Sequence, residues 1–394
     1  MQSFMSLFRC GGGVMDIDLL RRRVGEFFNG QYILEEFLGE GAFAEVFLVK
    51  HVFLDDFRVM KILKEPLSDT FNINHIFHEV RIASPLKHEN FISIHDAGII
   101  STGGENNREL VYFIMEYVPS GDLNQYVSSF INSNKMPPIY WIFILIKQIS
   151  YALNVLHSSN PPIVHGDLKP GNLLLSFNSE DHAVIKLTDF GFSKEMYGEK
   201  SMFSIAGTRL YMAPECFHNE FYPSTDIYAV GVISYLFLTL KFPFDVKSCE
   251  LSQILEGKPW DCELIPPSKY NPEVSPMLDE IVMKCLSVNP IDRYANAHEL
   301  FEALDNCMGS YDFDDETFVV SRDVIKAFRL AKYENKLSQS IEILKKYDMD
   351  MMFEQTISSG NLHSRNFSGI LEFHESSDSR TIQIRDILEF EGPK

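Results

Sequence analysis

The chain has 394 residues, of which 45% are hydrophobic and 23% are charged, an ordinary composition for a folded globular protein. Its net charge of −20 argues against a general nucleic-acid binder, because neutralising phosphates needs a basic surface. The longest apolar run, Ala229 to Leu240, is too short to cross a bilayer, so we expect no membrane span.

The cysteines also bear on the compartment. The six cysteines form no C-x-x-C pair and no dense framework, which favours free thiols in a reducing environment. Near the N-terminus, Arg21–Arg23 follows a mildly apolar segment, the reverse of the order in a secretory signal. We therefore expect a cytoplasmic protein.

Three zones are expected along the chain. Residues 1–30 form a short N-terminal extension, residues 31–308 carry every motif discussed below, and residues 309–394 form an acidic tail that is partly helical. In the tail, the apolar spacing over Asp323 to Tyr347 predicts one or two amphipathic helices. Ile370 to Phe373 and Thr381 to Ile384 flank a turn rich in serine and aspartate, which predicts a hairpin.

The middle zone begins with strands and continues with helices. Apolar and aromatic content predicts strands at Tyr32 to Leu38, Glu45 to His51, Arg58 to Leu63 and Leu110 to Tyr117. Apolar periodicity predicts helices at Asn74 to Leu86, Tyr140 to Ser158, Pro276 to Leu286 and Ala297 to Cys307. A strand-rich half followed by a larger helical half predicts an α+β fold with two lobes.

A glycine turn lies between the first two predicted strands. Glycines in such a turn let backbone amides approach phosphate oxygens without obstruction by side chains. The turn and its flanks comprise Leu38, Gly39, Glu40, Gly41, Ala42, Phe43, Ala44, Glu45 and Val46. On its own this motif is weak, because similar turns also occur in plain hairpins.

The run His165–Asn172 carries the strongest chemical signal in the sequence. It places Asp167, Lys169 and Asn172 in register, and Asp189 follows at the start of an Asp-Phe-Gly run. A carboxylate that can orient a hydroxyl, a cation for a migrating phosphate and two oxygen ligands for magnesium are the groups that phosphoryl transfer needs.

Together these motifs resemble the eukaryotic-type protein kinase family, and its serine/threonine branch in particular. The resemblance covers most of residues 31–308 and implies a bilobal protein-kinase-like fold that binds ATP and Mg²⁺ between its lobes. It also implies transfer of the γ-phosphate of ATP to serine or threonine hydroxyls of protein substrates. A lysine at the position of Lys169 is typical of the serine/threonine branch.

The resemblance assigns further roles at the nucleotide site. Lys61 would contact the α- and β-phosphates, Glu79 would be its ion-pair partner, and Val59 would stand in the adenine roof where the family usually has alanine. At the adenine end, Met115 would be the gatekeeper, Glu116 and Val118 would offer backbone hydrogen bonds, and Leu174 would form the floor. Asp122 would reach the ribose or a substrate residue.

The resemblance also assigns catalytic and structural roles. Asp167 would accept the hydroxyl proton, Lys169 would neutralise charge on the γ-phosphate, and Asn172 and Asp189 would hold magnesium. Thr208, before Tyr211–Glu215, would contact Asp167 and Lys169. Asp226 would bond to the backbone of the catalytic loop, and Arg293 would pair with Glu215.

Besides Val59, three positions depart from the family pattern. Ala44 replaces the usual third glycine of the loop, which adds one methyl group over the phosphates. Gly166 stands where many regulated kinases have an arginine that pairs with a phosphate on the activation segment. We therefore expect activity that does not depend on phosphorylation of Ser204. Gly171 replaces a glutamate that, in many relatives, recognises an arginine before the target serine of the substrate. A strong preference for basic substrates is therefore not expected.

Two alternative functions remain. A non-catalytic scaffold with this fold, a pseudokinase, would bind a partner through the fold and the tail, but such proteins typically lose one of the groups that are intact here. A small-molecule kinase of related fold is the third reading. The tail could be autoinhibitory, could dimerise or could dock a regulatory partner, or its residues 323–347 could pack on the large lobe.

Overall fold

The computed structural model describes residues 25, 27–28, 30–41, 44–64, 88–101, 109–133, 135–177, 183–189, 208–309, 311, 369–376 and 379–386. The chain divides into two compact units, residues 1–332 and 333–394, and each is described by itself. The predicted helices at Asn74 to Leu86 and within Asp323 to Tyr347 lie outside the described residues.

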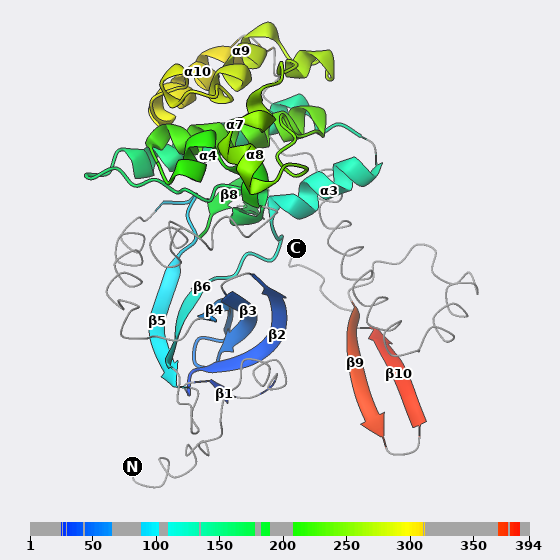
Figure 1. The fold of residues 1–394 in the computed structure, drawn as a ribbon. Helices are drawn as coiled ribbons and strands as arrows, with labels where there is room; N and C mark the ends of the chain where they lie inside the picture. The colour runs from blue at the N-terminus through cyan, green and yellow to red at the C-terminus, as the bar shows by residue number, and fades with distance from the viewer. Residues whose placement is uncertain are drawn as a thin grey trace, which may run out of the picture. The chain divides into compact units, whose positions relative to one another are not determined.

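The first unit begins with a six-stranded antiparallel sheet (Figure 1). Its spatial order is β1-β2-β3-β4-β6-β5. The strands are β1 (Phe27–Phe28), β2 (Tyr32–Glu40), β3 (Ala44–His51), β4 (Asp56–Leu63), β5 (Ile94–Ser101) and β6 (Glu109–Glu116). The four strands predicted here from sequence are confirmed as β2, β3, β4 and β6, whereas β1 and β5 were not predicted.

Side-chain alternation gives this sheet two apolar faces. Phe47, Val49 and Met60 belong to one buried cluster, whereas Ala44 and Met115 belong to another. Because neighbouring residues of a strand point to opposite faces, this arrangement separates a structural face from the face that carries the expected adenine contacts.

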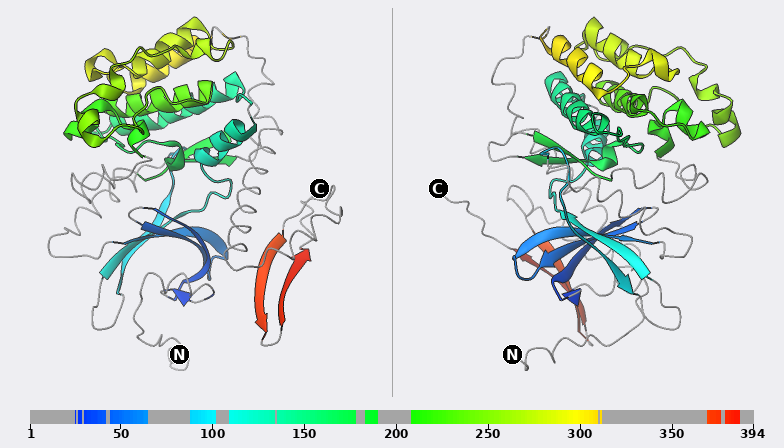
Figure 2. Two further views of the ribbon diagram at one scale, coloured as in Figure 1. Left: turned by 45° about the vertical axis from the view of Figure 1, so that its right-hand side comes forward. Right: turned by 90° about the vertical axis from the view of Figure 1, so that its left-hand side faces the viewer.

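A helical lobe follows (Figure 2). Its helices are α3 (Leu123–Ser133), α4 (Ile139–His157), α7 (Pro223–Thr239), α8 (Leu251–Leu255), α9 (Pro276–Cys285) and α10 (Ala297–Met308). Short 3₁₀ turns are η1 (Pro170–Asn172), η2 (Thr208–Tyr211), η3 (Pro214–His218), η4 (Lys258–Trp260), η5 (Pro267–Lys269) and η6 (Pro290–Asp292). Strands β7 (Leu173–Phe177) and β8 (Ala183–Leu187) form an antiparallel hairpin.

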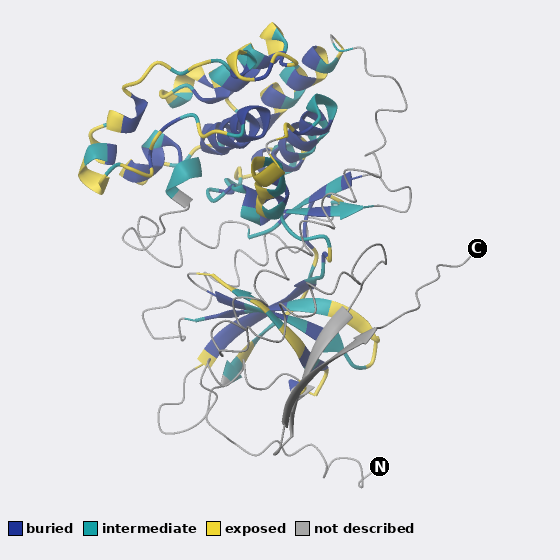
Figure 3. Ribbon diagram, turned by 90° about the vertical axis from the view of Figure 1, so that its right-hand side faces the viewer, coloured by how far each residue is buried: buried dark blue, intermediate teal, exposed yellow. Residues whose placement is uncertain are grey.

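Helix α7 lies at the centre of this lobe, and buried residues concentrate where it meets α4 (Figure 3). Pro223 starts the helix at a position where its missing N–H costs nothing. Among the described residues, one helix, α4, is long and apolar enough to cross a membrane. Its apolar side chains, including Trp141, Phe143 and Leu153, are buried in the protein core, as in a core helix.

The second unit contains a hairpin of β9 (Gly369–Ser376) and β10 (Ser379–Asp386). The strands pair antiparallel, with Phe373 opposite Ile382 and Leu371 opposite Ile384. The hairpin predicted from sequence in the acidic tail is thereby confirmed, with each strand longer than predicted.

Candidate active site

The residues expected around adenine come together on one face of the sheet. Ala44, Met115 and Val118 are buried in one cluster, against which Val59 and Leu174 pack. Val59 pairs with Met115 across β4 and β6, so the expected roof and gatekeeper are neighbours. Four elements that are distant in sequence thus form one apolar surface that suits a flat aromatic base.

The segment after β6 links the sheet to the helical lobe. Gly121 N donates to the carbonyl of Val118 at 3.4 Å, whereas the N–H of Val118 has no hydrogen bond to any residue in the described part of the chain. The backbone N–H groups of buried residues normally have a partner, and a ligand acceptor could be the partner of this one. This availability fits the backbone role expected of Val118.

The glycine turn closes β2 onto β3. Gly41 N donates to the carbonyl of Ala44 at 2.8 Å, and Gly39 pairs with Val46. Leu38 is exposed, while the side chain of Glu45 is buried on the face opposite Ala44, so any contact of Glu45 with nucleotide would be through its backbone. Glu40 forms an ion pair with Lys64, and Ala42 and Phe43 lie outside the described residues.

Lys61 and Asp189 form an ion pair across the site, with 2.5 Å between Lys61 Nζ and Asp189 Oδ1. Burial raises the pKa of Asp189, but the charge and hydrogen bond of Lys61, together with Lys169 and His165, lower the pKa by more, so it lies below its ordinary value of 3.8. Asp189 is therefore ionised at neutral pH. Glu79, the expected partner of Lys61, lies outside the described residues.

Asp167 lies at the centre of a hydrogen-bonded group. Lys169 Nζ is 2.7 Å from Asp167 Oδ2, and Asn172 Nδ2 donates to the backbone carbonyl of Asp167 at 2.7 Å and to Oδ2 at 3.2 Å. The other oxygen, Oδ1, is buried and accepts no hydrogen bond from the described residues. One carboxylate oxygen is thus fixed, and the other is available to accept a hydroxyl proton.

Asp226 of α7 holds the backbone of the loop that carries Asp167, the expected catalytic loop. Asp226 Oδ2 accepts from His165 N at 2.8 Å, and Oδ1 accepts from Gly166 N at 2.9 Å, as the resemblance implied. His157 Nδ1 accepts from Ala297 N at 3.1 Å, so Nε2 carries the hydrogen and donates to Asp226 Oδ2 at 3.0 Å. The N-terminus of α10 is thereby connected to the catalytic loop, a role for His157 that the sequence did not reveal.

Asn172 and Asp189 are suited to hold Mg²⁺ by the chemistry of their side chains. Thr188 N donates to the carbonyl of Asn172 at 3.0 Å. Because Thr188 directly precedes Asp189, this hydrogen bond brings the backbone next to Asp189 close to Asn172. Because the Nδ2 group of Asn172 is bonded to Asp167, its amide oxygen remains for a cation. A carboxylate and an amide oxygen are the ligand types that Mg²⁺ takes.

The remaining predicted residues have different outcomes. Asp122 lies between the linking segment and α3, where burial raises the pKa of its carboxyl above 3.8 despite hydrogen bonds from the backbone of Gln125 and Asn124. Thr208 begins η2, but the structure describes its backbone only and not its side chain. Arg293 pairs with Glu215 at 2.7 Å, as expected. Lys186, which pairs with Glu116, was not predicted.

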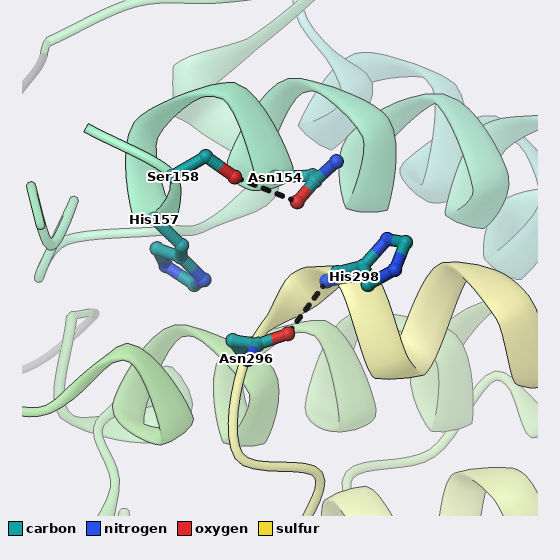
Figure 4. Close-up of a pocket in the computed structure, with 5 residues that line it drawn as sticks. All are labelled: Asn154, His157, Ser158, Asn296 and His298. Atoms are coloured by element: carbon teal, nitrogen blue, oxygen red, sulfur yellow. Dashed lines mark hydrogen bonds between the residues drawn. The ribbon is translucent and has the colours of Figure 1, made fainter.

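A polar hollow of about 380 Å³ lies at the junction of α4 and α10, apart from these groups (Figure 4). Asn154, His157, Ser158, Asn296 and His298 line it. Asn296 Oδ1 accepts from His298 N at 3.0 Å and from Glu299 N at 3.2 Å, and Ala297 N is bonded to His157. The first amides of α10 are therefore already satisfied, and this hollow offers no free donors of the helix to an anion.

Comparison with known proteins gives the family. The protein kinase domain family matches residues 32–304. The chain is 28% identical over 80% of its length to a probable serine/threonine-protein kinase of Clostridium acetobutylicum, and covers 45% of that protein. It is 30% identical over 71% of its length to the serine/threonine-protein kinase pkn3 of Myxococcus xanthus, and covers 50% of it.

The chain thus spans about half the length of the curated relatives it matches. Among solved structures, the PknI kinase domain of Mycobacterium tuberculosis superposes with a TM-score of 0.53 at 23% identity. The match covers 72% of this chain and 98% of the other. This similarity shows the bilobal kinase fold.

Proposed function

Because this chain belongs to the protein kinase family, we propose that it transfers the γ-phosphate of ATP to serine or threonine hydroxyls of protein substrates. The observation that carries the proposal is the state of Asp167. Its Oδ2 is held by Lys169 and Asn172, while its buried Oδ1 accepts no hydrogen bond from the described residues. A substrate hydroxyl is the donor that would complete this site.

The residues divide the chemistry between them. Asp167 Oδ1 accepts the hydrogen bond of the substrate hydroxyl and receives its proton late in the transfer. Lys169, which contacts the other oxygen, neutralises charge that develops on the transferred phosphoryl group. Lys61 orients the α- and β-phosphates, and it is positioned by Asp189.

Mg²⁺, held by Asn172 and Asp189, would neutralise phosphate charge and template the in-line arrangement when bound. The apolar surface of Ala44, Met115 and Leu174 receives the base, and Val118 N donates to it. Asp122 reaches the ribose. Each of these roles follows from the family and from the chemistry of the residue at that place.

The test is magnesium-dependent phosphate transfer from labelled ATP, with wild type beside Asp167→Asn. Asp305→Asn is the matched control, because Asp305 is largely exposed, pairs with Lys147 and lies on α10. We expect phosphoserine or phosphothreonine from wild type and from Asp305→Asn, and a loss of more than about 100-fold in Asp167→Asn. If all three proteins bind ATP and none transfers phosphate, the scaffold alternative gains weight.

Two further proposals concern the setting of the enzyme. We propose a cytoplasmic location, which is supported by the free thiols of Cys216, Cys249, Cys262, Cys285 and Cys307. We also propose that the tail binds a regulatory partner. Removing residues 333–394 leaves the first compact unit whole, so a change in specific activity, rather than in solubility, would support regulation.

A further inference from the structure

An ion pair connects Glu116, the last residue of β6, to Lys186 on β8 in the helical lobe. Lys186 Nζ on β8 lies 2.9 Å from Glu116 Oε1 and 3.1 Å from Oε2. The two side chains are only 15% and 27% exposed, so solvent screens the pair less than it screens most surface pairs.

Glu116 is also fixed from the sheet side. Its backbone N donates to the carbonyl of Ser93 at 2.9 Å, and Ser93 N donates to Glu116 Oε2 at 3.3 Å. The carboxylate therefore joins the start of β5 to β8 through Lys186. Rotation of Glu116 away from this position would break contacts on both sides.

The other end of the linking segment is fixed to the same hairpin. Leu175 N donates to the carbonyl of Gly121 at 2.9 Å, and Asp122 bridges to Leu174. Leu174, the expected adenine floor, is the residue paired with Lys186 across β7 and β8. The floor and the lysine thus lie on the same two-stranded hairpin.

We propose that Lys186 is a positioning residue for the nucleotide base, and this inference rests on the proposed function. Its ion pair with Glu116 fixes one end of residues 116–122 to the hairpin, and backbone contacts fix the other end. Val118, whose N–H has no partner among the described residues, lies between the two. The distance between this donor and the Leu174 floor is therefore set by the ion pair.

The test measures binding of ATP and of adenosine to the full chain by calorimetry, because adenosine reports on the base without the phosphates. Lys186→Met keeps most of the length of the side chain and removes its charge, whereas Lys186→Arg keeps the charge. Lys147→Met is the matched control, since Lys147 forms an ion pair with Asp305 outside the site. Lys61→Met serves as the reference for a defect at the phosphate end.

We expect Lys186→Met to weaken both ligands to a similar degree, roughly five-fold, which corresponds to about 1 kcal/mol. Lys186→Arg should stay close to wild type, and Lys147→Met should not differ from it. Lys61→Met should weaken ATP far more than adenosine. In kinetics, Lys186→Met should raise KM for ATP while kcat at saturating ATP is retained.

Unchanged affinity for adenosine in Lys186→Met would overturn the inference, provided that wild type binds ATP. Should Lys186→Met not fold, Glu116→Gln removes the same charge pair and keeps an acceptor for Ser93 N, so an unchanged adenosine affinity there would overturn it equally. Absence of ATP binding in wild type would instead contradict the proposed function itself.

Discussion

Lys61 Nζ lies 2.5 Å from Asp189 Oδ1, so a strand of the sheet and the segment after β8 are joined by opposite charges in the site. The two residues are 128 positions apart in the chain. Each residue offsets the free-energy penalty of the other's partly buried charge, because a carboxylate without a cation and an ammonium without an anion are both unfavourable there. The nucleotide phosphates and Mg²⁺ would therefore enter a site whose charges are already arranged.

The first prediction is a pH-dependent loss of stability in Lys61→Met. In the wild type, the lowered pKa of Asp189 means that its ionised form stabilises the fold above pH 3.8, and this contribution is lost as pH falls through the folded-state pKa. Without Lys61, burial dominates and the pKa of Asp189 rises. We expect a loss on the order of 1–3 kcal/mol at pH 7, by urea unfolding, that shrinks as pH falls toward 4.

Asp189→Asn in the Lys61→Met background is the control for this effect, because it removes the carboxylate that has lost its cation. It should recover stability at pH 7 and abolish the pH dependence. A difference between wild type and Lys61→Met that stays constant from pH 7 to 4 would show that Asp189 is not the responsible group.

The second prediction concerns the buried pair of Glu215 and Arg293. The guanidinium contacts both oxygens of Glu215, at 2.7 and 2.8 Å, and also donates to the carbonyls of Ser287, Val288 and Ser224. The two side chains are 6% and 0% exposed. Replacing Arg293 by methionine should cost about 3–5 kcal/mol in chemical denaturation, because it leaves a buried carboxylate unpaired.

Lys147→Met is the comparison for this measurement, since its partner Asp305 is 59% exposed. That variant should lose less than about 1 kcal/mol. Equal losses in the two variants would mean that the burial of Arg293 adds nothing. Restoring stability in Arg293→Met by adding Glu215→Gln would show that the unpaired charge is the cause.

The grouping of the expected catalytic residues could be predicted where a short run of sequence contains them all. Asp167, Lys169 and Asn172 lie within one loop, and their close grouping follows from their spacing. The apolar and aromatic content that predicted β2, β3, β4 and β6 was likewise visible locally. Features that depend on only a few neighbouring residues could therefore be predicted from this sequence.

Residue pairs that are distant in the chain could not be predicted from the sequence, except where the family pattern supplied them. Lys186 and Glu116 are 70 positions apart, and His157 and Asp226 are 69 apart, so neither pair leaves a local signal. From the sequence, a lysine in a short strand is predicted to be solvated. The structure shows that Lys186 instead pairs with a carboxylate. Short elements such as β1 lack the length for a period to emerge.

The third prediction is that Gly231→Ala destabilises the helical lobe. A Cβ at this position of α7 would lie 2.8 Å from Cys285 Cβ, closer than real Cβ contacts come, and a tight 3.1 Å from Leu286 Cγ. The helices would have to separate, so we expect a loss of about 1–3 kcal/mol despite the better helix propensity of alanine. Thermal unfolding followed by circular dichroism measures it.

A double-mutant cycle with Cys285→Gly tests the cause, because this change removes the atom nearest to the new methyl group. The double variant should be more stable than the sum of the single losses predicts, by roughly 1 kcal/mol. Strictly additive losses would show that α7 and α9 do not meet in this way.

The fourth prediction is that Ser204→Ala retains activity. Gly166 has no side chain to pair with a phosphate on the segment that contains Ser204, which lies outside the described residues. Its φ of +74° disfavours other residues, and a Cβ there would meet the ring of Phe221 at 3.7 Å. Gly166 therefore offers no cation to a phosphate on this segment.

The measurement is the initial rate of phosphate transfer by Ser204→Ala and by wild type, both preincubated with ATP and Mg²⁺ and neither treated with phosphatase. We expect the two rates to agree within about twofold, because Gly166 has no charge to pair with a phosphate at Ser204. Asp167→Asn shows the floor of the assay. A large loss in Ser204→Ala, with an unchanged melting temperature, would mean that a cation other than one at position 166 receives a phosphate on this segment, and control by phosphorylation would have to be sought there.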